Sequence, residues 1–109
     1  MKSSNVGRAT RMACALLVAT PVAAADHTVV QRSKSFGAPR LVVSVGDTIK
    51  FVNLDDVPHN AFSLSKTHPF DTGMLTRGNS KDVTFSKAGV VEVECAVHPS
   101  MTMTVEVRP

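Results

Sequence analysis

Apolar and polar side chains alternate with a period of two over several short segments of the chain. In residues 90–95 (VVEVEC), Val91, Val93 and Cys95 fall on one face and the two glutamates fall on the other. Residues 101–108 (MTMTVEVR) continue the same alternation. This period is typical of strands that bury one face and expose the other. The pattern therefore predicts two half-buried β-strands near the end of the chain.

Three further segments have the composition of strands. Residues 41–45 (LVVSV) and 48–54 (TIKFVNL) are separated by a Gly–Asp turn, and residues 82–85 (DVTF) precede the turn sequence SKAG. β-Branched and aromatic residues favour extended backbone, whereas glycine, aspartate and serine favour turns. No segment after residue 25 has the period of a helix. Short antiparallel strands at this spacing predict an all-β Greek-key sandwich or barrel of about six to eight strands.

Two stretches lack this patterning and are expected to be connections. Residues 63–79 contain two glycines and one proline, so we expect a long loop with at most one short strand. Residues 31–40 are polar and rich in turn residues. His68 lies in the first stretch and is expected to be a solvated loop residue.

The beginning of the chain has the three-part pattern of a secretory signal peptide. Basic residues precede an apolar run at residues 12–20, and small residues end the segment at Ala25. The apolar run is too short to cross ~30 Å of hydrocarbon. We therefore predict that residues 1–25 are removed, that residues 26–109 form a single periplasmic domain, and that no membrane span remains.

Removal of this segment changes both the charge and the cysteine content. The formal net charge of +3 falls to zero, because three basic residues are lost and nine basic and nine acidic residues remain. A neutral domain without a run of basic residues among aromatics lacks the charged surface that binds nucleic acid. We also expect the domain to be a monomer. Cys14 is lost and no leucine precedes it as a lipid-anchoring site would require. Cys95 is then a lone thiol that needs an intermolecular partner, a reactive role or a metal.

The residues around this thiol suggest the metal. Cys95, His98 and Met101 lie within the seven residues CAVHPSM, and Pro99 restricts the loop between them. A further histidine, His59, follows the strand at 48–54. Two imidazoles and a thiolate with a weak axial thioether are the ligand set of a blue-copper electron-transfer site.

The sequences VPHN and VEVECAVHPSM resemble those of the cupredoxins, the small type 1 blue-copper proteins. The short Cys-x-x-His-x-x-Met loop is similar to that of amicyanin, and the PHN sequence is similar to those of amicyanin and pseudoazurin. The likeness covers most of residues 41–107. It implies a cupredoxin-type sandwich with one copper, held by His59, Cys95 and His98 in the plane and by Met101 on the axis. It also implies that Asn60 ties the two ligand loops together and bonds the cysteine sulfur, which would tune the potential.

The chain departs from this family in three ways. Valines stand at residues 91 and 93, where the family usually has aromatics, and the sequence contains no Trp or Tyr. The chain after residue 25 is also short, so we expect a reduced N-terminal strand. These departures concern packing and the electron path, and the ligand set is retained.

The candidate ligands and the other polar residues also have purely structural explanations. Met101 has the parity of Met103 and could fill the core, since methionine is a common gap-filler. A lone buried cysteine is usually inert, and single histidines are often only surface residues. His27 is expected to lie in an unstructured end. The acidic pair at residues 55–56 is expected to form a solvated turn, and a docking role is the alternative.

The favoured function is that of a periplasmic electron carrier that is not an enzyme. An apolar rim around His98 would dock redox partners briefly, and by analogy these are a dehydrogenase donor and a cytochrome acceptor. The alternative is a copper-delivery protein without a redox role, although the chain lacks a Met-rich open site. A multicopper enzyme would need more ligands than the four histidines provide. A metal-free binding domain or a zinc site of the same ligands also remains open.

Overall fold

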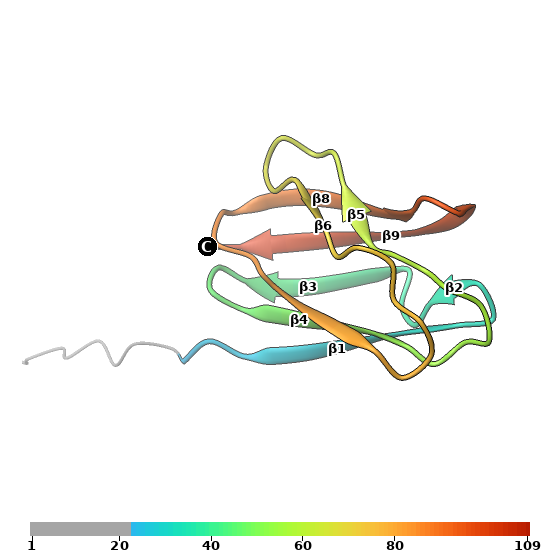
Figure 1. The fold of residues 1–109 in the computed structure, drawn as a ribbon. Coiled ribbons are helices and arrows are strands. Elements are labelled where there is room, and N and C mark those ends of the chain that lie inside the picture. Colours follow the sequence, from blue (N-terminus) through green and yellow to red (C-terminus); the bar gives the residue numbers. More distant parts are fainter. Residues whose placement is uncertain (1–22) are drawn as a thin grey trace, which may run out of the picture.

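The computed structural model describes residues 23–109, which form two β-sheets (Figure 1). Most of the predicted signal peptide, residues 1–22, lies outside the described residues. The strands are β1 (Asp26–Arg32), β2 (Ser35–Phe36), β3 (Arg40–Ser44), β4 (Thr48–Asn53), β5 (Phe62–Ser63), β6 (Phe70–Asp71), β7 (Ser80–Thr84), β8 (Gly89–Cys95) and β9 (His98–Arg108). Within this part of the chain, no helix is long and apolar enough to cross a membrane.

The sheets have the strand orders β2-β1-β4-β7 and β3-β9-β8-β5-β6. The all-β sandwich is therefore confirmed, with nine strands in the described part rather than six to eight, because three strands are only two residues long. Both sheets are mixed. β1 runs parallel to β4, and β3 runs parallel to β9. The other strand pairs are antiparallel, as the sequence suggested. The two parallel pairs were not predicted, because the alternation of side chains does not encode the direction of a partner.

The core lies between the two sheets and follows the predicted alternation. In β8 and β9 the inward residues are almost fully buried, including Val91, Val93 and Val105. Phenylalanines fill the space that the smaller valines leave: the rings of Phe51 and Phe70 stack at 5.9 Å between centroids. Burying side chains of this size contributes about 1.5–3 kcal/mol each.

His68 is not the solvated loop residue that the sequence suggested. It is half-buried, and its ring lies 4.9 Å from that of Phe85 and 5.9 Å from that of Phe70. The loop that carries His68 thus packs the imidazole ring against Phe70 and Phe85. An imidazole can serve there because its flat face packs like a hydrocarbon ring.

The N-terminal strand is complete rather than reduced. β1 has seven residues and pairs with β4 from Asp26 to Gln31. His27, expected in an unstructured end, lies in this strand, and its Nε2 is 2.9 Å from Asp47 Oδ2. Asp47 also accepts hydrogen bonds from the backbone N–H groups of Ala25 and Ser44. These bonds, chiefly the two from the backbone, lower the pKa of Asp47 to about 2.

One end of the sandwich gathers the segments that carry the candidate ligands. The β4–β5 connection, the β8–β9 turn and the β1–β2 hairpin all lie there, at the right of Figure 1. The β3–β4 turn, with Asp47, lies at the opposite end.

Candidate metal centre

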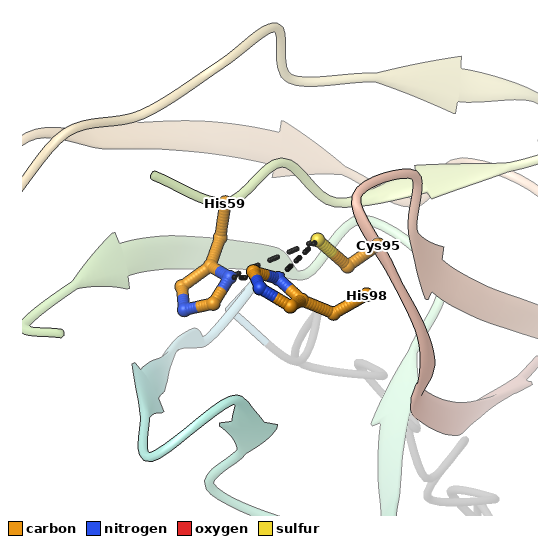
Figure 2. A group of neighbouring side chains, drawn as sticks. All are labelled: His59, Cys95 and His98. Atoms are coloured by element: carbon orange, nitrogen blue, oxygen red, sulfur yellow. Dashed lines mark hydrogen bonds between the residues drawn. The ribbon is translucent and has the colours of Figure 1, made fainter. Parts of the chain in front are cut away.

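Three side chains converge at this end of the molecule. His59 and Cys95 are buried and His98 is half-buried. Figure 2 shows both imidazole rings turning a nitrogen toward the sulfur. His59 Nδ1 lies 3.1 Å from His98 Nδ1, and Cys95 Sγ lies 3.8 Å from each of these nitrogens. The group is formed by residues 39 positions apart in the sequence.

The β8–β9 turn brings Cys95 and His98 to this point. Cys95 is the last residue of β8 and lies on its buried face, and His98 opens β9 opposite it. The strand register shifts between Glu94 and Cys95. Such an irregularity locally re-aims side chains, and it lets cysteine and histidine face the same side of the turn.

His59 is fixed by its backbone as well as by its ring. Its N–H donates to Leu75 O at 3.1 Å, and Leu75 N–H donates back to His59 O at 2.7 Å. This isolated bridge ties the β4–β5 connection to the segment before β7. The bridge pairs both backbone groups of a buried loop residue, which would cost free energy if left unpaired.

Asp55 determines which nitrogen of His59 is free. His59 Nε2 lies 2.8 Å from Asp55 Oδ2. The hydrogen bond from His59, together with backbone N–H groups of Lys34 and Asp56, lowers the pKa of Asp55 well below its usual range. An ionised carboxylate only accepts hydrogen bonds, so Nε2 carries the proton. In the neutral ring, Nδ1 is then the nitrogen without a proton, and it faces Cys95 and His98. The predicted solvated turn at Asp55 is thus wrong.

Asn60 joins the two segments that carry the converging side chains. Its side-chain Oδ1 accepts the backbone N–H of Ala96 at 2.7 Å, and its Nδ2 donates to Asp71 at 3.2 Å. Asn60 is buried and directly follows His59. A hydrogen bond between the loops holds Cys95 and His59 at a set separation.

Met101 is placed on the inward face of β9. It is 1% exposed, and it shares that face with Met103, Val105 and Val107. It lies three positions after His98 on the same strand, near the converging group. The structure thus keeps both possibilities for its thioether, as a core filler and as a fourth donor.

The converging atoms fit a metal ion. A triangle with edges of 3.1, 3.8 and 3.8 Å has its centre about 2.1 Å from each corner. Metal–nitrogen and metal–sulfur bonds are about 2.0–2.3 Å long. Two imidazoles and one thiolate are a soft-to-borderline set suited to copper. The donors are also held before any ion binds, because each belongs to a strand end or a bridged loop.

Of the residues that hold the donors, sequence reasoning predicted Asn60 but missed the others, and Asn60 donates to Asp71 rather than to the cysteine sulfur. Asn53 is fully buried and donates from Nδ2 to the carbonyls of Val57 and Leu75, while its Oδ1 accepts the N–H of Asp55. One signal was available in the sequence: a carboxylate four residues before His59 in DDVPHN. No pattern indicated Leu75, because its partner is set by the fold.

Comparison with known proteins agrees with this geometry. Residues 23–108 match the family described as copper binding proteins, plastocyanin/azurin family. The chain is 34% identical over 89 residues to amicyanin from Paracoccus versutus, with 74% of this chain and 67% of that protein covered. It is 31% identical over 90 residues to methylamine utilization protein MauL from Methylorubrum extorquens, covering 82% and 79%. The match to amicyanin from Paracoccus denitrificans is 30% identical over 69 residues and covers 61% of this chain but only 53% of that protein.

Solved structures show the same fold. A reduced amicyanin variant superposes with a TM-score of 0.72 at 28% identity, covering 80% of this chain and 86% of that chain. A copper-containing nitrite reductase from Thermus scotoductus reaches 0.71 at 31% identity, but the match covers 76% of this chain and only 22% of the enzyme. The family match, the relatives and the fold lead to one conclusion: this chain belongs to the plastocyanin/azurin family of copper-binding proteins, as an amicyanin-like cupredoxin.

Proposed function

We propose that this protein is a periplasmic single-electron carrier with one type 1 copper. In this proposal His59, Cys95 and His98 are the in-plane ligands and Met101 is the axial ligand. The observation that carries it is the triangle of two imidazole nitrogens and one sulfur with edges of 3.1 to 3.8 Å. A copper ion bound by such donors supplies one-electron Cu(I)/Cu(II) chemistry.

The surroundings of the donors suit electron transfer. Asn53, Asp55 and Asn60 hydrogen-bond the loop around His59, and His59 itself is fully buried. Each side chain has several partners, so the donors keep their places when the charge of the site changes. A small rearrangement favours fast transfer, whereas a delivery protein needs an accessible site that releases its ion. The burial of His59 and Cys95 therefore favours a carrier over the copper-delivery alternative.

His98 is the donor nearest to solvent, and it gives the site a route to partners. It is half-buried, while the neighbouring Pro58, Ala96, Val97 and Pro99 are exposed. These small apolar residues form a rim that a redox partner can cover without desolvating charge. Small interfaces of this kind are typical of transient electron-transfer complexes. The likeness to amicyanin and to a methylamine utilization protein supports a dehydrogenase donor and a cytochrome acceptor.

The same proposal covers the organisation of the chain. Residues 1–25 are the export signal, and residues 26–109 are one copper-binding domain that acts as a monomer. The family match from residue 23 onward supports this division. An enzymatic role is not proposed, because the described residues hold one grouping of potential metal donors rather than several.

Electrochemistry tests the carrier role directly. The copper-loaded protein should give a reversible one-electron wave, and a small-molecule oxidant should re-oxidise it fully after reduction by ascorbate. The matched control is Cys95→Ser, which keeps the size of the side chain and removes the soft thiolate. A copper-loaded protein that binds the ion but shows no reversible wave would contradict the carrier and favour delivery.

A further inference from the structure

The turn between β1 and β2 has an unusual backbone. Ser33 and Lys34 have φ angles of 53° and 55°, and they are the non-glycine residues with positive φ among residues 23–109. Two successive residues in this region form a type I′ hairpin turn, for which Asn and Gly are strongly preferred. Side chains with a Cβ raise the energy of this conformation. Strain of this kind persists where the surrounding structure requires it, and it clusters at functional sites.

The strained turn contacts the carboxylate that orients His59. The backbone N–H of Lys34 donates to Asp55 Oδ2 at 2.8 Å. The same oxygen accepts His59 Nε2–H, also at 2.8 Å. The other oxygen, Oδ1, accepts the N–H of the adjacent Asp56, so Lys34 and His59 together fix the orientation of Oδ2. The Lys34 N–H reaches Asp55 from a turn in which both residues have positive φ.

β1 holds the same loop at two more points. Leu54 N–H donates to Gln31 O at 2.9 Å, before His59 in the sequence, and Gln31 Nε2 donates to Asn60 O at 3.2 Å, after it. Gln31 is fully buried, and its Oε1 is the one buried side-chain N or O atom without a partner among the described residues. A buried amide that leaves an acceptor unpaired is a poor choice for stability. Its position is better explained by the loop it supports.

We propose that the β1–β2 hairpin is a positioning element of the metal centre: its turn N–H at Lys34 fixes Asp55, and Asp55 keeps His59 in the tautomer whose Nδ1 faces Cys95. That this tautomer serves to bind copper rests on the function proposed above. The presence of the Nε2–H tautomer is independent of that function, because Asp55 and Lys34 would hold it in the metal-free protein. Ser33, Lys34 and Gln31 touch none of the donor atoms, so they act only through Asp55 and the loop.

The test removes the Lys34 N–H and leaves the chain otherwise intact. Lys34→Pro lacks the N–H, and Lys34→Gly keeps it and adopts positive φ without strain. Both lose the lysine charge, so they form a matched pair. Because proline cannot adopt the native turn, a second variant carries the α-hydroxy analogue of lysine at residue 34, which replaces the N–H by an ester oxygen. Gly46→Ala, in the β3–β4 turn with φ +98°, strains a hairpin at the opposite end and controls for strain alone.

The first readout needs no metal. Long-range ¹H–¹⁵N spectra of the imidazoles should show His59 as a single Nε2–H tautomer in the original protein, in Lys34→Gly and in Gly46→Ala. The ester and proline variants should show exchange between both neutral tautomers. If the ester variant keeps the single tautomer, the hairpin does not position His59 and the proposal is wrong.

The second readout links the hairpin to copper. Loss of a residue that orients a metal ligand typically weakens metal binding 10–100-fold. We expect the Cu(II) dissociation constant of the ester variant to rise roughly tenfold relative to the original protein, whose lysine side chain it keeps, at the low end of that range because the N–H acts through Asp55. An equal dissociation constant would overturn the copper part of the inference. A failure of the proposed function looks different, since the original protein would then bind copper without a thiolate band while the tautomer result still held.

Discussion

The two ends of this sandwich each contain a carboxylate paired with a histidine, yet among residues 23–109 only one end brings three potential metal donors together. Asp47 accepts His27 Nε2 and two backbone N–H groups, and Asp55 accepts His59 Nε2 and two backbone N–H groups. The hydrogen bonds around the two carboxylates are therefore alike. The two ends differ in the surroundings of the second imidazole nitrogen, which in His59 faces Cys95 and His98. In the described part of the chain, His27 belongs to no such group.

This comparison shows that a carboxylate–histidine pair is not a site by itself. At the Asp47 end the pair fastens β1 to the β3–β4 turn, and its histidine side chain is 25% exposed. At the Asp55 end the histidine side chain is fully buried, and two further donors meet it. What distinguishes the metal centre from the structural Asp47–His27 contact is therefore the surroundings of the second imidazole nitrogen, and not the carboxylate–histidine pair.

The largest effect should come from breaking the group of donors. Cys95→Ser should abolish the intense thiolate-to-copper absorption and weaken copper binding by at least tenfold, because a neutral hydroxyl replaces the soft thiolate ligand. His27→Gln at the other end should leave both unchanged. Visible absorption during a Cu(II) titration measures both variants. Equal loss in the two variants would show that the ends are not chemically distinct.

The next test compares the two carboxylates. Asp55→Asn should weaken copper binding 10–100-fold, because the acceptor that fixes the Nε2–H tautomer loses its charge. Asp47→Asn should lower the thermal unfolding midpoint by several degrees and leave the copper affinity within twofold. Calorimetric titration and thermal unfolding of both proteins give the comparison. A copper affinity that falls equally in Asp47→Asn would contradict the separation of roles.

The pH dependence of stability tests the structural role of Asp47. The pKa of Asp47 falls from 3.8 to about 2 on folding. A lowered carboxyl pKa stabilises the fold at pH above the unfolded value, and this contribution is lost as the pH falls from about 4 to 2. The metal-free protein should therefore lose stability over this range more steeply than Asp47→Asn. Urea unfolding at several pH values would measure it, and parallel curves would remove Asp47 from the acid transition.

The smallest effect is expected at Met101. Met101→Leu conserves volume, so the metal-free fold should change by less than about 1.5 kcal/mol. The copper band should persist and the reduction potential should shift, because the axial ligand tunes the potential without providing most of the binding. Potentiometry alongside urea unfolding separates the two roles. An unchanged potential would assign Met101 to the core alone.

The strands at 90–95 and 101–108 were predicted from the sequence, because the alternation of apolar and polar side chains is visible in neighbouring residues. The convergence of His59, Cys95 and His98 also follows what the sequence predicted, since the Cys95–His98 spacing is local and the PHN sequence resembles that of the family. Met101 as an axial donor stays a prediction. Most of the supporting contacts were not predicted from the sequence. The role of Asp55, the Leu75 bridge and the pairing of β1 with β4 depend on residues that only the fold brings together.

The central claim is tested most directly by adding Cu(II) to residues 26–109, the proposed mature protein, and recording visible absorption and EPR spectra. The account predicts one equivalent bound, an intense blue or green thiolate band with narrow copper hyperfine splitting, and reversible bleaching by ascorbate. A pale protein with ordinary Cu(II) hyperfine splitting would show that Cys95 does not bind copper. The convergence of His59, Cys95 and His98 would then be a feature of packing.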